Sequence, residues 1–146
     1  MRRAAIAGIA GLMALAAPTA AGADSIKHEG TIAGQPEAQV KFAVKKNDGR
    51  LQKVTNLRFN RVPVTCDDGT GGAITAQLPN FGLGGKEKFT RKGPIQGAGI
   101  TDGTLRAFGK IASNGRKARG NVRIAFKSSS GLGCGTGVLN WSTKKR

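Results

Sequence analysis

Short alternations of apolar and polar residues, separated by Gly, Asn and Asp, run through most of the chain after residue 23. Val40, Phe42 and Val44 alternate with basic or small residues, which predicts a strand with an apolar inner face and a basic outer face. Asn47-Asp48-Gly49 follows at once and predicts a hairpin turn, because these residue types tolerate positive φ. The return strand is expected over residues 51–66.

The apolar side chains of this return strand change from one face to the other half-way along. Leu57 and Phe59 share one face, whereas Val62 and Val64 fall on the opposite one. A register shift near Asn60-Arg61 is therefore required, and a β-bulge is the simplest way to produce it.

The clearest pattern is a second hairpin, with strands over 104–112 and 118–127 joined by Asn114-Gly115. Further strands are expected over 31–32, 74–78 and 134–143. Residues 81–103 are the least regular part of the sequence, with at most a short strand near 88–91. The tail 144–146 is expected to fray. Such spacing predicts an all-β fold: an antiparallel β-sandwich or small β-barrel of about 7–8 strands, in one domain over residues 24–146.

The first 23 residues have the pattern of a secretory signal peptide. Arg2 and Arg3 precede an uncharged, mostly apolar stretch, and Ala21-Gly22-Ala23 forms a small-residue cleavage site. The apolar stretch is shorter than the roughly 20 residues that a spanning helix needs. We therefore expect export, a mature chain without a transmembrane segment, and a location outside the cell or in its envelope.

The chain has two cysteines, Cys66 and Cys134. An even cysteine count in an exported protein predicts a disulfide, with two free thiols as the alternative. Trp141 is expected to pack near this bond.

Basic residues dominate the charged positions. The chain holds 24 Lys and Arg against 8 Asp and Glu, a formal net charge of +16. Such a charge attracts polyanions, although surface Lys and Arg also serve simply as solvated side chains. For an exported protein the partners to consider are wall polymers and acidic polysaccharides.

The candidate polyanion-binding residues all fall on the outer faces of the expected strands. If these strands are neighbours, the basic side chains merge into one positive surface. Phe108 alternates in step with Arg106 and Lys110, so it is the one candidate aromatic on this surface. Nucleic-acid binding usually needs several exposed rings for stacking, so their scarcity favours an acidic polymer as the partner. The candidates are Lys41, Lys45, Arg58, Arg106, Lys110, Arg119, Arg123 and Lys127.

Residue types for catalysis or metal binding are sparse. His28 is the single histidine, and its place near the start of the mature chain predicts a surface residue without a catalytic partner. Two Cys and one His do not make a standard structural zinc site. Asp67-Asp68-Gly69 lacks the spacing of a calcium loop and is read as a turn. No catalytic residue, metal or cofactor is expected, and the pattern predicts no oligomeric state.

Several motifs together resemble small secreted all-β proteins of Gram-positive bacteria, which carry one Cys pair and have no assigned activity. The resemblance implies export, an all-β fold and a disulfide, and it transfers no catalytic residue. It is carried by Gly30-Thr31-Ile32-x-Gly34, Val40-x-Phe42-x-Val44, Val54 with Leu57-x-Phe59 leading to Cys66, Ala118-x-Gly120-x-Val122, and Cys134-x-x-Gly137-x-x-x-Trp141.

Three functions compete on this basis. A secreted, non-enzymatic domain that binds an anionic polymer through its Lys/Arg face is the leading interpretation. A small-ligand carrier with a lipocalin-like cavity is the second, and an exported inhibitor that presents a loop from residues 81–103 is the third.

Overall fold

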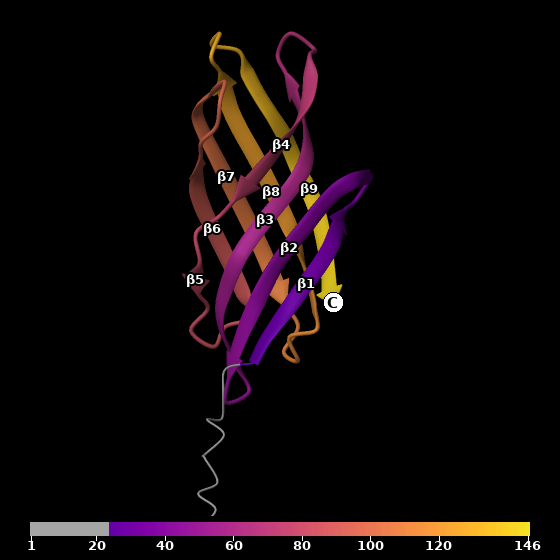
Figure 1. Cartoon of the computed structure of the whole chain (residues 1–146), viewed down its shortest axis with the longest axis vertical. Helices are drawn as coiled ribbons and strands as arrows, with labels where there is room; N and C mark the ends of the chain where they lie inside the picture. Colours follow the sequence, from indigo (N-terminus) through magenta and orange to yellow (C-terminus); the bar gives the residue numbers. More distant parts are fainter. Residues whose placement is uncertain (1–23) are drawn as a thin grey trace, which may run out of the picture.

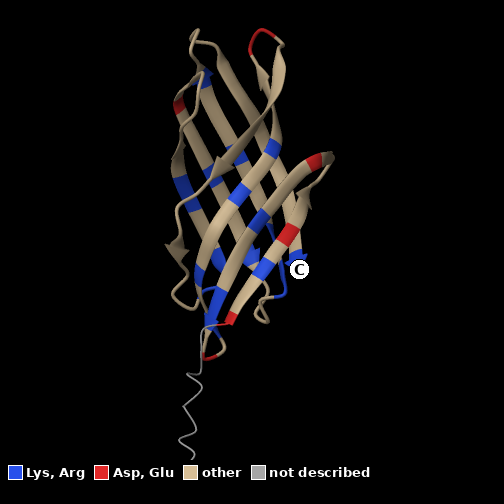
Figure 2. Ribbon diagram, in the orientation of Figure 1, with Lys and Arg blue, Asp and Glu red and all other residues tan. Residues whose placement is uncertain are grey.

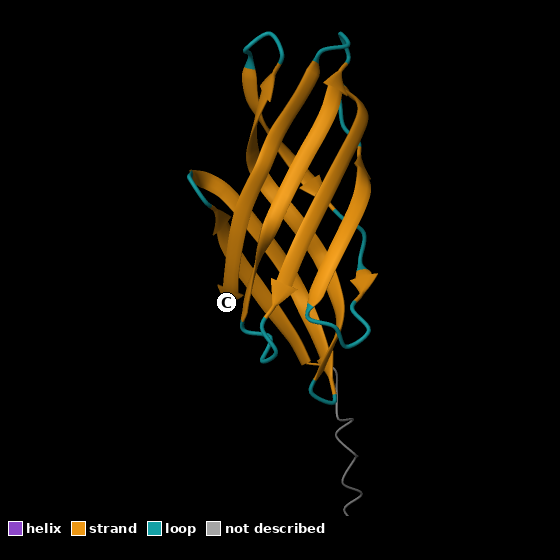
Figure 3. Cartoon of the chain, turned by 180° about the vertical axis from the view of Figure 1, so that it is seen from behind, coloured by secondary structure: helices purple, strands orange, loops and turns teal. Residues whose placement is uncertain are grey.

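A computed structural model describes residues 24–146, so the predicted signal peptide lies outside the described residues. These residues form nine strands and no helix (Figure 1 and Figure 3). Within them no helix is long and apolar enough to cross a membrane. The strands are β1 (Asp24–Ile32), β2 (Gln35–Asn47), β3 (Arg50–Cys66), β4 (Gly71–Gln77), β5 (Phe81–Gly82), β6 (Lys88–Ile95), β7 (Ile100–Ile111), β8 (Lys117–Ser128) and β9 (Gly133–Lys145).

All strands belong to one antiparallel sheet in the order β4-β3-β2-β1-β9-β8-β7-β6, with β5 added on β3. The sheet folds over on itself, so that β1–β5 form a front layer and β6–β9 a back layer (Figure 1). The long β3 runs past the β1–β2 hairpin, and its end pairs with the start of β9. This pairing closes a ring of β1, β2, β3 and β9. The predicted all-β, antiparallel fold is confirmed, and the shortest strand is the two-residue β5.

The Cys66–Cys134 disulfide is present and joins these two strand ends. Cys66 and Cys134 lie directly opposite each other in the β3–β9 register. Trp141, predicted to pack near this bond, does not. It lies seven residues further along β9, about 24 Å away at the usual rise of a strand. There its ring makes edge contacts with Phe42 and Phe59, with centroids 5.9 and 6.3 Å apart.

The apolar face of each predicted strand fills the space between the layers. Val40, Phe42 and Val44 of β2 are buried, as their alternation predicts. On β8, Val122 and Ile124 are fully buried, and Arg123 between them is exposed. The alternation of side chains therefore sets which residues reach the outer surface of each layer.

Local backbone irregularities also follow the prediction. Asp48 and Gly49, at the β2–β3 turn, have φ of 50° and 75°. The register of β3 against β4 shifts between Phe59 and Val62, and Arg61 at that bulge has φ of 53°. The bulge turns Val62 and Val64 back toward the core.

Three expectations about strand lengths are wrong. The first strand, expected over 31–32, is the nine-residue β1 (Asp24–Ile32), because it pairs with β2 from end to end. β6 extends to Ile95, because each of its residues pairs with β7. The C-terminal tail does not fray, because β9 lies between β8 and β1. The Lys145 N–H donates to the Arg116 carbonyl at 2.7 Å, and the Arg146 N–H donates to the Lys27 carbonyl at 2.9 Å.

Candidate anion-binding face

The eight candidate basic residues divide between the two layers (Figure 2). Strands β2 and β3 are not neighbours of β7 and β8, because β1 and β9 lie between them in the sheet. The condition for one merged surface is therefore not met. The front layer carries Lys41, Lys45 and Arg58, and the back layer carries Arg106, Lys110, Arg119, Arg123 and Lys127.

The outward side of β6–β9, here called the back face, has the denser set of cations. Its strands are in register, so that basic residues lie opposite one another across three strands. One row consists of Lys92, Arg106 and Arg123, and a second consists of Lys88, Lys110 and Arg119. Neighbouring strands are about 4.8 Å apart, and four residues along a strand separate the rows by about 13 Å.

Lys88 and Lys92 are back-face cations that sequence reasoning missed. Both belong to β6, which lies in the glycine-rich stretch read as irregular. Their only sequence signal is the alternation with Phe89 and Gly93, both of which are buried.

Phe108 lies between the two rows on β7 and is 37% exposed. Its cross-strand neighbours are Thr90 on β6 and Asn121 on β8. The prediction that Phe108 is a surface aromatic is confirmed. The back face thus has a neutral strip with one exposed ring between two positive rows.

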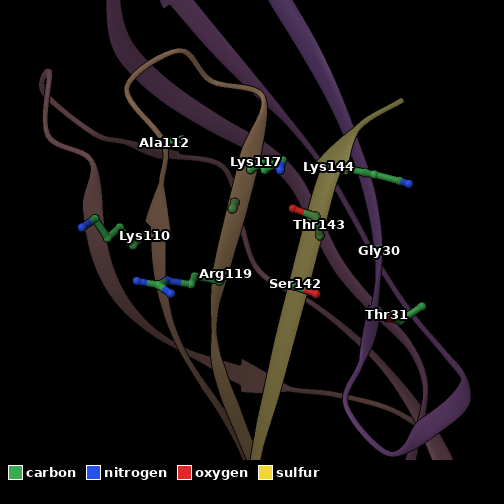
Figure 4. Close-up of a pocket in the computed structure, with 10 residues that line it drawn as sticks. Gly30, Thr31, Lys110, Ala112, Lys117, Arg119, Ser142, Thr143 and Lys144 are labelled. Carbon is green, nitrogen blue, oxygen red and sulfur yellow. The ribbon is translucent and has the colours of Figure 1, made fainter.

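The end of the back face near the β7–β8 turn is hollowed into a groove of about 760 Å³, at the place where β9 joins β1 (Figure 4). Four of the lining residues are cations, and none is an acid. Figure 4 shows Lys110 and Arg119 extending to one side of the groove and Lys144 to the other. The groove is lined by Gly30, Thr31, Lys110, Ala112, Lys117, Ala118, Arg119, Ser142, Thr143 and Lys144.

Few acids oppose these cations. Among residues 24–146 there are two ion pairs, and both involve Glu29 on β1, with Lys41 at 3.9 Å and Arg146 at 3.5 Å. Glu87 precedes β6 and Asp102 is near the start of β7, so they lie at opposite ends of the back layer. Within the described part of the chain, no cation of the two rows is held in an ion pair.

His28 is not the surface residue that its position near the start of the mature chain predicts. It is 2% exposed and stacks on Phe42, with ring centroids 4.5 Å apart. Its Nε2–H donates to the Gly115 carbonyl at 2.7 Å, and its Nδ1 accepts from the Thr143 hydroxyl at 3.0 Å. A carbonyl only accepts, so Nε2 carries a proton, and in the neutral ring Nδ1 is then the acceptor of the Thr143 hydroxyl.

Burial lowers the pKa of His28 from its usual value of 6.5, and the bond to the Gly115 carbonyl opposes this in part. Thr143, which His28 holds, also lines the groove. His28 therefore acts as a structural support beneath the groove.

Acidic side chains do not form a metal centre in the described range. Residues 24–146 contain no group of three or more His, Cys, Asp or Glu suited to hold a metal ion. The carboxylate of Asp68 instead accepts hydrogen bonds from the hydroxyl and the backbone N–H of Thr70, at 2.6 and 3.0 Å. These bonds lower the pKa of Asp68, with the hydroxyl contributing most.

Comparisons of the chain with protein-family models, with curated proteins and with solved structures give no significant match. Its function is therefore inferred from the back face and the groove themselves.

Proposed function

We propose that this protein is an exported, non-enzymatic domain that binds an anionic polymer on its back face. The observation that carries the proposal is the pair of cationic rows, Lys92–Arg106–Arg123 and Lys88–Lys110–Arg119, aligned across β6, β7 and β8. A wall polymer or an acidic polysaccharide is the expected partner class. The Cys66–Cys134 disulfide is compatible with work outside the cytoplasm.

The physical basis is electrostatic. Cations without a carboxylate partner are hydrated in the free protein and are available to neutralise charges on a ligand. A polymer that lies across the rows releases its condensed counterions, which favours binding and makes the affinity depend on salt. The formal net charge of +16 adds long-range attraction.

The interior of the sandwich supports this proposal over a small-ligand carrier. Aromatic rings occupy the region between the layers, where His28 stacks on Phe42 and Trp141 contacts both Phe42 and Phe59. The groove lies on the outer surface instead. An inhibitory loop within residues 81–103 is also less favoured, because β5, β6 and the start of β7 take up much of that stretch.

A pair of charge-matched variants tests the proposal. The first replaces Lys88, Lys92, Arg106 and Arg123 by Gln on the back face. The second replaces Lys41, Lys45, Lys53 and Arg58 by Gln on the front layer, where the exposed Lys53 of β3 pairs with Lys45 of β2. Each variant loses four positive charges. Binding of the oxidised protein to polygalacturonate, heparin, poly(glycerol phosphate) and duplex DNA is measured by isothermal calorimetry in about 0.15 M salt, near physiological ionic strength.

We expect the back-face variant to lose at least about tenfold in affinity for one acidic polymer, while the front variant stays within about threefold. Equal losses in both variants contradict a dedicated face, since net charge alone then explains binding. Absence of polymer binding by the unmodified protein contradicts the proposal as a whole.

A further inference from the structure

The groove differs from the rest of the back face because it combines a hollow with cations on both of its sides. Small residues leave the space, since Ala112 and Ser142, which are not buried, line the groove where larger side chains would fill it. Its volume of about 760 Å³ is within the range of small-molecule sites, so it holds a few sugar-sized units rather than one small ion.

The lining presents two kinds of group to a ligand. Lys110, Lys117, Arg119 and Lys144 come from three different strands and form the positive part. Thr31 and Ser142, which pair across β1 and β9, are exposed and supply hydroxyls. The remaining residues supply mostly carbon surface.

The walls of the groove are held in place by long-range contacts. His28 accepts a hydrogen bond from the hydroxyl of Thr143, and the Lys145 N–H bonds to the carbonyl of Arg116. Gly30 lies so close to β9 that a Cβ there would overlap the carbonyl oxygen of Ser142. The backbone of a site formed by paired strands loses little conformational entropy on binding.

We propose that this groove binds a short segment of an acidic oligosaccharide, with sugar rings that carry carboxylate or sulfate groups. Sugars offer hydroxyls for Thr31 and Ser142 and C–H faces for the carbon surface, and their anionic groups suit the four cations. The planar guanidinium of Arg119 is able to bind a carboxylate through two parallel hydrogen bonds. The inference rests on the proposed function and names the class of polymer that the back face binds.

The groove is less suited to nucleic acid. Proteins that bind single strands stack bases on aromatic side chains, and the groove lining contains none. Phe108, the exposed ring of the back face, lies outside this lining. A nucleic-acid ligand is therefore the alternative outcome of the test.

The test uses a substitution that fills the groove without changing the charge. Ser142→Phe adds a ring at an exposed position in the lining, and Asn140→Phe adds the same ring two residues away on β9, outside the lining. Titrations use tetragalacturonate, a heparin-derived tetrasaccharide and, for each of them, a single-stranded oligonucleotide of the same charge. We expect S142F to weaken binding of one tetrasaccharide by at least about tenfold, and N140F to change it less than about twofold.

A second pair guards against misfolding of S142F. Lys117→Gln with Lys144→Gln removes two groove cations, and Lys88→Gln with Lys92→Gln removes two cations outside it. Thermal unfolding of each variant is compared with that of the unmodified protein. The first pair is expected to weaken tetrasaccharide binding by at least about fivefold more than the second.

Three results overturn the inference. They are no tetrasaccharide binding, unchanged tetrasaccharide binding by both folded groove variants, and oligonucleotide binding as tight as that of both tetrasaccharides. If long polymers still bind and the back-face variant still loses them, the groove assignment alone fails. If neither the tetrasaccharides nor the long polymers bind, the proposed function fails together with the groove assignment.

Discussion

His28 and Gly115 are 87 residues apart in the chain, and the Nε2–H of His28 donates a 2.7 Å hydrogen bond to the Gly115 carbonyl. This bond joins β1 of the front layer to the β7–β8 turn of the back layer. The imidazole is 2% exposed, and its other nitrogen accepts from Thr143. The two layers are thus linked by a ring that is neutral in the folded protein.

The buried neutral ring predicts a loss of stability in mild acid. Burial lowers the pKa of His28 in the folded protein, so the unfolded chain binds a proton at higher pH than the folded one. The contribution of the neutral His28 to stability is therefore fully present above the unfolded pKa of about 6.5. It is lost as the pH falls below that value toward the pKa of the folded protein. Urea unfolding at pH 7.5, 6.5 and 5.5 measures this change.

The matched control for that experiment is His28→Gln, because His28 is the only histidine of the chain. The variant should be less stable at pH 7.5, and its free energy of unfolding should change little between pH 7.5 and 5.5. An equally steep decrease in the variant would mean that other groups cause the acid sensitivity.

The disulfide holds a short strand pairing together, and its removal should lower the stability of the fold. β3 and β9 pair through only Thr65 with Gly135 and Cys66 with Cys134. The bond closes a loop with a sequence separation of 68 residues, and the chain-entropy model assigns such a loop about 4 kcal/mol. Replacing both cysteines by Ser should lower the free energy of unfolding by about this amount.

Chemical denaturation with and without a reducing agent checks this value. Reductant should destabilise the unmodified protein to the level of the double Ser variant, and should leave that variant unchanged. A native protein indifferent to reductant would show that the bond contributes nothing to stability.

Gly120 should not tolerate even a methyl group. It pairs with Gly109 on β7 and with Trp141 on β9. A Cβ at Gly120 would overlap the carbonyl oxygen of Phe108 and approach the Trp141 ring to 2.8 Å. Gly120→Ala is expected to cost about 3 kcal/mol or more, because backbone and a buried ring have to move together.

A strand glycine in open space provides the comparison. A Cβ at Gly72 on β4 meets nothing within 4 Å, and no positive φ is present there. Gly72→Ala should therefore change the melting temperature little, whereas Gly120→Ala should lower it strongly. Similar melting temperatures for the two variants would disprove the close packing of β7, β8 and β9 around Trp141.

Local patterns were sufficient to predict the strands whose apolar faces are regular. The alternation around Phe42, the positive φ at Gly49 and the bulge near Arg61 each depend on neighbours in sequence, and each is present. The outward position of Phe108 follows from the same parity.

Features that depend on strand order were not predictable in this way. His28 is buried because the β7–β8 turn and Phe42 enclose it, and neither contact leaves a mark in the local sequence. Lys117 and Lys144 meet across β8 and β9, although one follows a turn and the other belongs to a tail that reads as frayed. The groove therefore depends on the strand order and register of the sheet, which the local sequence does not predict.

Salt dependence offers a final prediction about which cations contact the polymer. Each cation that neutralises a charge on a polyanion contributes roughly 0.7 to 0.9 to the slope of log K against log salt concentration. Arg123→Gln, in the middle of the back face, should therefore reduce the slope for the bound polymer by about this amount. Arg58→Gln, on the outer side of the front layer, should leave it unchanged while lowering the net charge equally. Affinities measured between about 0.05 and 0.2 M salt give both slopes. Equal reductions would place the polymer on both layers, and an unchanged slope for R123Q would remove that row from the binding surface.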